Sequence, residues 1–223
     1  MSKFNFTKIQ TGQQFNFSKD YGVSATTTIS FNLNWGMIGN EAVDLDAFLV
    51  LEQRNGKPEI IKGKKASWLS KLFGGKDEPD TVRGGSAFVD TVSFRKLQTA
   101  GVLHHGDDTT GAWSDGEFIE INLGSLDPRV NTLTFAVLSF SGHKFKDIPF
   151  AEIKVFTGKP DDPRRPLVEH CLKQFSANTQ TVVLGQMVRK ADGTWDFQAM
   201  NGQSPNKNVS GVTQVCKATG LVN

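Results

Sequence analysis

The amino-acid sequence predicts an all-β protein, a two-sheet β-sandwich, from three features. Short stretches that alternate polar and apolar residues recur along the chain, which is the period of a strand whose two faces differ. Turn residues separate these stretches at short intervals, and almost no segment has the apolar period of a helix. The 17 phenylalanines against one tyrosine favour strands packed on an aromatic core. We therefore expect one sandwich domain over residues 1–223.

The expected strands follow from these patterns in chain order. Residues 4–8 and 15–19 alternate with period two around a turn, and predict a short hairpin. The continuous apolar run at 133–140 predicts a strand buried on both faces. Asp192-Gly193 is a hairpin signal between the last two strands. The other expected strands are 25–33, 43–52, 87–94, 118–123, 149–156, 167–172, 181–188 and 195–199.

Strand 43–52 carries the first pair of candidate site residues. Side chains alternate along a strand, so Asp44 and Asp46 share a face with Phe48, opposite the face of Leu45 and Ala47. Their Cα atoms are then about 6.6 Å apart, at about 3.3 Å per residue. Two carboxylates at this spacing bind one calcium ion only if they lean toward each other.

The second acidic element is the loop at residues 106–117, which leads directly into strand 118–123. Its carboxylates are Asp107, Asp108, Asp115 and Glu117, spaced by Gly, Thr and Ser. Many hard oxygens on a turn-rich segment suit the flexible six-to-eight-oxygen shell of calcium, although the spacing is not that of an EF-hand. The alternative is that the two acidic elements do not converge and that these are ordinary turn residues.

Residues 55–85 are expected to form an inserted loop or short helix, beginning at the turn signal Asn55-Gly56. Within this basic segment, residues 64–73 fit a short amphipathic helix that carries Trp68, Leu69, Leu72 and Phe73 between lysines. Such a helix suits contact with an anionic membrane or a protein partner. The alternative is a loop whose aromatic side chains fold onto the sandwich.

Composition excludes several classes of protein. The net charge of +2 and the pI near 8.5 are too balanced to predict a nucleic-acid partner. Cys171 and Cys216 form no disulfide framework and favour a reducing compartment. The alternating start differs from a signal peptide, and no apolar run is long enough to span a membrane. We therefore expect a cytoplasmic protein. Association with the inner face of the membrane is compatible with this expectation.

Other site chemistries find less support in the sequence. His104-His105 has no further His or Cys at zinc-ligand spacing, so a pair of edge-strand histidines is the favoured interpretation. No phosphate-binding loop or nucleophile elbow is present. A hydrolase that uses an acidic pair needs one carboxyl in an apolar pocket, whereas these acids lie among polar turn residues.

The two acidic elements, in this order, resemble the TerD-type tellurium-resistance and stress-response proteins of bacteria. Val43-Asp44-Leu45-Asp46-Ala47 is similar to that family's DLDA signature, and residues 105–111 with 115–117 resemble its GDN-x-TG…DDE loop. Residues 8–19 resemble the family's opening, and residues 193–199 its closing tryptophan strand. The chain departs from the pattern at Asp108, where the family has Asn, and at Gly116, where it has an acid.

The resemblance implies a calcium-binding β-sandwich with no established enzymatic activity. It makes six residues the candidate calcium ligands, namely Asp44, Asp46, Asp107, Asp108, Asp115 and Glu117. Our first hypothesis is a non-enzymatic stress-response protein that acts through protein partners of a stress-response complex or through the membrane. The alternatives are a calcium-dependent carbohydrate- or lipid-binding sandwich and, least supported, a hydrolase. Residues 204–223 form a C-terminal tail with a polar start at 204–208, and its end is expected either to be loosely ordered or to add a last strand.

Overall fold

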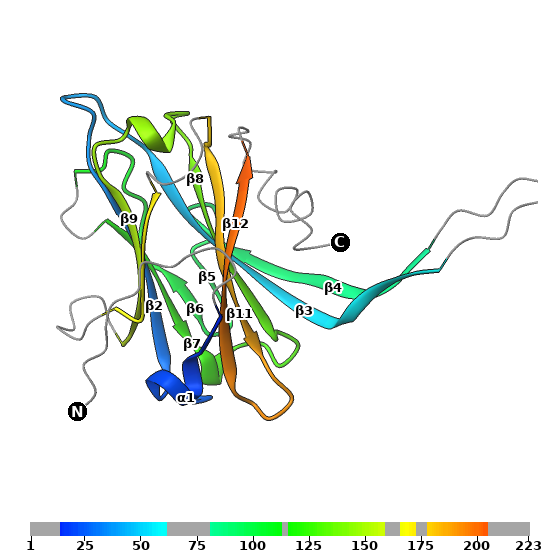
Figure 1. Ribbon diagram of the computed structural model, residues 1–223. Helices are drawn as coiled ribbons and strands as arrows, with labels where there is room; N and C mark the ends of the chain where they lie inside the picture. Colours follow the sequence, from blue (N-terminus) through cyan, green and yellow to red (C-terminus); the bar gives the residue numbers. More distant parts are fainter. Residues whose placement is uncertain (1–13, 62–80, 113–115, 159–165, 173–177, 205–223) are drawn as a thin grey trace, which may run out of the picture.

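The computed structural model describes residues 14–61, 81–112, 116–158, 166–172 and 178–204, and these form two stacked antiparallel sheets (Figure 1). The first sheet has the spatial order β1 (Gln14–Asn16), β12 (Trp195–Ser204), β11 (Thr181–Arg189), β8 (Thr132–Ser139), β3 (Leu45–Ile61) and β4 (Thr81–Val92). The second has the order β10 (Val168–Cys171), β9 (Ala151–Thr157), β2 (Thr28–Trp35), β7 (Glu117–Asn122), β6 (Val102–His104) and β5 (Gln98–Thr99). The predicted all-β sandwich is confirmed.

The core lies between the sheets and follows the predicted alternation. On β3, Leu45, Ala47 and Leu49 face the core, whereas Phe48 and Val50 belong to a second apolar cluster on the other face of that sheet. β8 is buried along its whole length, as its uninterrupted apolar run predicts. The hairpin between β11 and β12 is confirmed as well, and its turn contains Gly193 in the left-handed region, at φ 81°.

The prediction of a strand over residues 15–19 is wrong beyond its first residues. β1 ends at Asn16, and the short helix α1 (Phe17–Tyr21) follows it. The Asn16 side chain accepts a hydrogen bond from the backbone N–H of Lys19, which caps the helix, and Phe17 is buried in a stack on Phe197. The polar–apolar alternation cannot reveal this cap. The expected partner strand, residues 4–8, lies outside the described residues.

The insertion at 55–85 differs from the expected loop or short helix wherever it is described. β3 continues through Asn55 to Ile61 and pairs with β4 from Thr81 onward, and this hairpin leaves the body of the sandwich (Figure 1). Asn55-Gly56 is therefore not a turn. The register between the strands shifts between Asn55 and Glu59, so an irregularity within the ladder accommodates these residues. The expected contact residues Trp68, Leu69, Leu72 and Phe73 lie outside the described residues, as does the tail beyond Ser204.

Short helical pieces complete the described chain. Besides α1, these include the 3-10 helices η1 (Leu123–Ser125) and η2 (Phe145–Asp147). No helix within the described ranges is long and apolar enough to cross a membrane. The loops that follow β2, β6 and β8 gather at one end of the sandwich, the upper end in Figure 1.

Candidate metal centre

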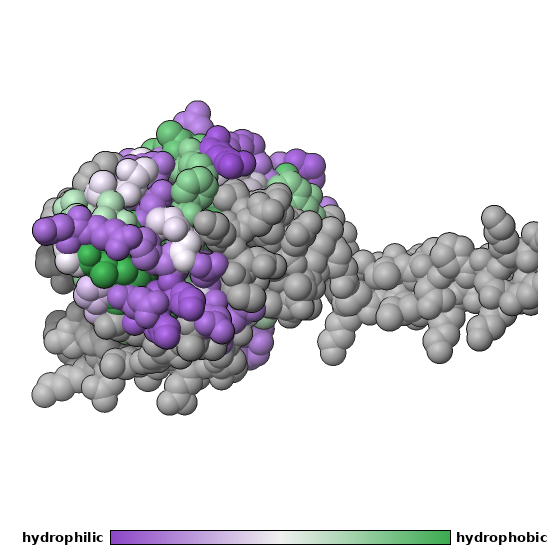
Figure 2. All heavy atoms as spheres, turned by 90° about the horizontal axis from the view of Figure 1, so that it is seen from above, coloured by the Kyte–Doolittle hydropathy of each residue, from purple (hydrophilic) through white to green (hydrophobic). Residues whose placement is uncertain are grey.

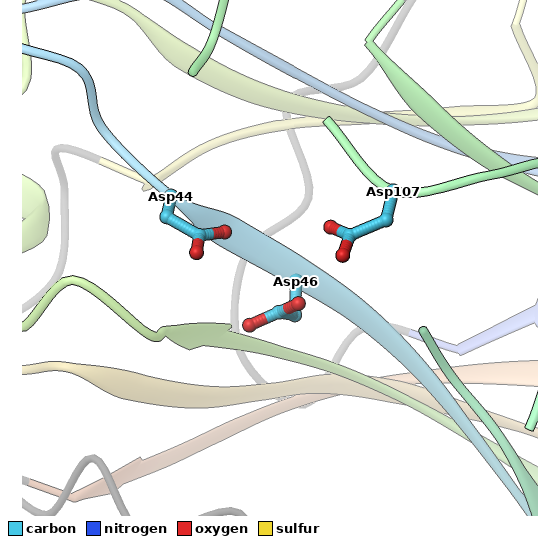
Figure 3. A group of neighbouring side chains, drawn as sticks. All are labelled: Asp44, Asp46 and Asp107. Atoms are coloured by element: carbon cyan, nitrogen blue, oxygen red, sulfur yellow. The ribbon is translucent and has the colours of Figure 1, made fainter. Parts of the chain in front are cut away.

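Three of the predicted ligands meet at this end of the sandwich. Asp44 and Asp46 flank the first residue of β3, and Asp107 lies in the loop after β6. One carboxylate oxygen from each lies within 4.8 Å of the others, and the three carboxylates point toward a common space (Figure 3). Two oxygens on opposite sides of a calcium ion are about 4.8 Å apart, at about 2.4 Å per bond. The two acidic elements therefore converge at a spacing that suits calcium.

The start of β3 is available for this site because only one neighbouring strand covers it. β3 pairs with β8 from Leu45 onward, but its pairing with β4 begins only at Leu49. The edge of β3 around Asp46 thus has backbone groups that no strand satisfies, and a buried N–H group needs a partner. A side chain from the opposite sheet supplies that partner.

Glu117, the first residue of β7, accepts hydrogen bonds from both acidic segments. Its Oε2 accepts from the backbone N–H of Ala47 at 2.9 Å, and its Oε1 accepts from the backbone N–H of Asp108 at 3.1 Å. Each donor belongs to the residue that directly follows a metal-candidate aspartate, Asp46 or Asp107. Glu117, 1% exposed, therefore holds the two aspartate-bearing segments together rather than serving mainly as a free ligand.

Asp108 organises the acidic loop from within. Its Oδ1 accepts from the backbone N–H and hydroxyl of Thr110, at 2.9 and 2.7 Å, and from the backbone N–H of Gly111 at 3.1 Å. Such a turn needs one side-chain oxygen at this position, which Asn supplies equally well. The substitution of Asp for the usual Asn thus preserves the loop.

Trp35, at the end of β2, fixes the loop against the segment before β3. Its indole N–H donates to the Val43 carbonyl at 2.7 Å, and the Val43 N–H donates in turn to the Thr110 carbonyl at 3.2 Å. A Cβ atom at Gly111 would lie 2.5 Å from the indole nitrogen, so the loop reaches this close approach only with glycine. Sequence reasoning missed this role because Trp35 appears only as the end of an apolar strand.

His104 is also part of the site, contrary to the expectation of an edge-strand histidine. It is 2% exposed, and its strand β6 lies between β7 and β5 rather than at the sheet edge. The Gly106 N–H donates to its Nδ1 at 3.3 Å, which places the proton of the neutral ring on Nε2, 3.5 Å from Glu117 Oε2. Burial lowers the pKa of His104, so this is a pair of neutral groups at neutral pH.

The three aspartates lack the hydrogen bonds that buried oxygens require. Oδ1 of Asp44, Oδ2 of Asp46 and Oδ1 of Asp107 are buried, and none has a hydrogen-bond donor among the residues that the structure describes. Buried polar atoms are nearly always hydrogen-bonded, because an unmatched one retains its full desolvation cost. Three buried oxygens without donors therefore face one space at this end of the sandwich.

The electrostatics of the site reflect the crowding of these buried carboxylates. Burial, then the charges of neighbouring carboxylates, raises the pKa of Asp44 to about 6 and that of Asp46 to about 8. Burial raises the pKa of Glu117 to about 9 despite its two backbone donors, and the charge of Asp107 acts in the same direction. Two such charges 4 Å apart repel by about 4 kcal/mol at the effective dielectric of a protein surface. A divalent cation removes this repulsion.

The metal-free protein is expected to lose stability as the pH rises from about 5 to 9. The raised pKa values mean that the native state binds more protons than the unfolded state in this window, so the free energy of unfolding falls with pH. Urea unfolding in chelator at pH 5.5, 7 and 9 measures this slope. Stability that stays flat or increases over that range would contradict the electrostatic description.

The remaining predicted ligands are distributed as follows. Asp108 lies beside the three aspartates and engages its own loop, Glu117 holds the segments together, and Asp115 lies outside the described residues. Cys171 lies on β10, in a sheet-edge strand, and is a free thiol. Arg95 and Phe140, discussed below, are two further neighbours of the site that the sequence did not single out.

Comparison with known proteins identifies the family. A model of the TerD domain matches residues 88–214. The chain is 34% identical to the tellurium resistance protein TerZ of Serratia marcescens over 146 residues, which cover 61% of this chain and 72% of that protein.

Solved structures share the fold at low sequence identity. A crystal structure of a protein of unknown function superposes with a TM-score of 0.58 at 14% identity, over 84% of this chain and 95% of that one. A homologue of the telluride resistance protein TerD from Streptomyces coelicolor gives a TM-score of 0.57 at 14% identity, over 83% and 95%. The family match and the identity to TerZ show that the chain belongs to the TerD family of tellurium-resistance proteins.

Proposed function

We propose that this tellurium-resistance-like protein binds calcium through Asp44, Asp46 and Asp107 and acts by binding rather than by catalysis. The observation that carries the proposal is the set of three buried carboxylate oxygens without hydrogen-bond donors. Calcium prefers carboxylate oxygens and tolerates irregular shells, whereas magnesium requires near-ideal octahedral geometry at shorter distances. The spacing of up to 4.8 Å favours the larger ion.

The residues around the three aspartates would position them for calcium binding. Glu117 sets the separation of the two ligand segments through its hydrogen bonds to Ala47 and Asp108, and Trp35 fixes the loop from the other side. Partners of this kind, which orient the ligands, contribute strongly to metal affinity. Asp115 remains a further candidate ligand on the basis of sequence.

A hydrolytic dyad fits the site less well. Both carboxylate oxygens of the buried Glu117 accept backbone N–H groups, whereas the two carboxyls of a glycosidase dyad stand about 5 Å or more apart to leave room for substrate or water. We therefore favour a binding role in the cytoplasm, with protein partners of a stress-response complex or with a membrane surface. In this role calcium would rigidify the loop end of the sandwich.

Calcium is expected to raise the melting temperature of the chelator-stripped protein by about 5 to 10 °C. An ion that binds only the native state at a hundred-fold excess over Kd contributes about 2.7 kcal/mol, and each kcal/mol shifts the Tm of a domain of this size by about 2 to 4 °C. Differential scanning calorimetry with millimolar calcium measures the shift, and equal magnesium serves as the control. An unchanged Tm in calcium, or an equal shift in magnesium, would count against the proposal.

A further inference from the structure

We propose that the calcium-loaded end of the sandwich docks on a bilayer of anionic phospholipid, with a headgroup phosphate held between the bound ion and Arg95 and with Phe140 inserted beside it. This inference rests on the calcium site proposed above. It adds the chemical class of the ligand and two residues that the metal site itself does not require.

The residues that the structure describes supply an incomplete shell for calcium. Calcium takes six to eight oxygens, and the three aspartates together provide between three and six. Asp46 is 2% exposed and closes the inner side of the site, whereas Asp107 is more exposed. The ion would thus keep coordination positions on its outer side, where phosphate oxygens of an external ligand can replace water.

Arg95 places a positive charge beside the acidic centre. Its guanidinium lies over the Phe94 ring, 5.4 Å from the centroid, and makes no hydrogen bond to any residue that the structure describes. Its positive charge acts on Asp46, so Arg95 lies within electrostatic reach of the acidic centre. Once calcium neutralises the aspartates, that attraction falls, and the planar guanidinium is free to bind a phosphate in bidentate fashion.

An exposed aromatic side chain lies beside the site. Phe140, the residue after β8, is 44% exposed, and its backbone N–H donates to the Asp44 carbonyl at 3.0 Å. Its ring packs edge-on against Phe94 at 5.7 Å, and Phe94 packs against the buried Phe48 at 6.3 Å. The row of three rings anchors Phe140 to the sheet, so that it can enter the interfacial region without distorting the site.

The surrounding surface suits a peripheral contact. Viewed onto this end, the described surface is largely hydrophilic with small apolar patches between (Figure 2). The loop that contains Phe140 also carries Lys144 and Lys146, of which Lys146 is about half exposed and lies 3.9 Å from Asp147. Basic side chains near a membrane surface attract anionic lipids. One inserted aromatic residue, beside a phosphate that contacts both the calcium ion and Arg95, is consistent with reversible, calcium-dependent docking.

Sedimentation with vesicles tests the proposal on the full-length protein. We expect binding to phosphatidylserine-containing vesicles in calcium, and at least a tenfold loss of affinity in chelator or on phosphatidylcholine alone. Arg95→Gln and Phe140→Ser are each expected to weaken vesicle binding at least tenfold. Calcium binding measured without vesicles stays within threefold of the wild-type value in both variants, and Arg95→Gln shifts it, if at all, toward tighter binding because a nearby positive charge is removed.

Matched controls use another exposed arginine and another exposed apolar residue. Arg129→Gln changes an exposed arginine paired with Asp127, and Leu103→Ser changes a 40% exposed apolar residue on β6; both should bind vesicles like the wild type. Calcium-loaded protein that ignores the vesicles, or variants at Arg95 and Phe140 that bind them normally, would overturn the docking proposal. So would inorganic phosphate or glycerophosphoserine that binds as tightly as the vesicles, because the ligand would then be a free phosphate. Absence of calcium binding without vesicles would instead refute the metal site itself.

Discussion

Asp46→Asn is expected to lower the calcium affinity by about 100-fold or more, while the metal-free protein stays folded. Asp46 is the most buried of the three aspartates, and its Oδ2 has no donor among the described residues. Asn retains the size of the side chain and one carbonyl oxygen but loses the charge that holds a divalent ion. The loss of one charged ligand is worth about 3 kcal/mol or more here, since each tenfold change in Kd is 1.4 kcal/mol.

The same substitution is expected to stabilise the metal-free protein at pH 9. Burial and the charges of Glu117 and Asp44 raise the pKa of Asp46 to about 8, so its ionised form destabilises the native state above that pH. Asn removes this penalty. This result would distinguish a metal ligand from a structural residue. Replacing a metal ligand raises the stability of the metal-free protein, whereas replacing a structural residue lowers it.

Titration calorimetry with calcium and urea unfolding in chelator measure both effects. Asp127→Asn is the control, since Asp127 is an aspartate that pairs with Arg129 in the turn before β8. It should leave the calcium affinity unchanged. If Asp46→Asn binds calcium as tightly as the wild type, Asp46 is not a ligand, and the orphan oxygen needs another explanation.

Gly116→Ala is expected to destabilise the protein by about 3 kcal/mol or more. Gly116 has φ +62°, in the left-handed region that costs other residues about 1 to 2 kcal/mol. A Cβ atom there would lie 2.1 Å from the Leu33 carbonyl oxygen and 2.9 Å from the Asn34 Cα, so backbone must move. Overpacking of this kind adds about 1 to 3 kcal/mol.

The displacement also reaches the metal site, because Gly116 directly precedes Glu117. Any shift at this point moves the carboxyl that accepts from Ala47 and Asp108. The local backbone at Gly116 therefore leaves no room for a side chain.

Gly193→Ala is the matched control for this prediction. Gly193 also has a positive φ, 81°, but no atom lies within 4 Å of the position of an added Cβ. The Gly193→Ala variant should therefore lose only about 1 to 2 kcal/mol of stability, the cost of the left-handed conformation for a residue with a Cβ atom. Urea unfolding of both variants measures the difference, and equal losses would mean that the close approach to Leu33 relaxes at little cost.

Much of this protein was determined by its sequence alone. Apolar residues that alternate along a strand must bury one face, so the sheets, the faces of β3 and the doubly buried β8 were predictable. The acidic residues at 44, 46 and 107 were recognisable as candidate ligands, because carboxylates on turn-rich segments suit a hard cation. Their order along the chain also predicted the family.

Only the tertiary structure decided which acidic side chains face one common space and which hold the surrounding backbone in place. Periodicity assigns a side chain to a face but does not say which strand lies beside it. Because β4 joins β3 only at Leu49, the edge at Asp46 is open, and Glu117 from the opposite sheet fills it. That placement turns a predicted ligand into a residue that positions two others, and brings His104 into the site. The pairing of strand edges, which depends on contacts far apart in sequence, fixed these roles.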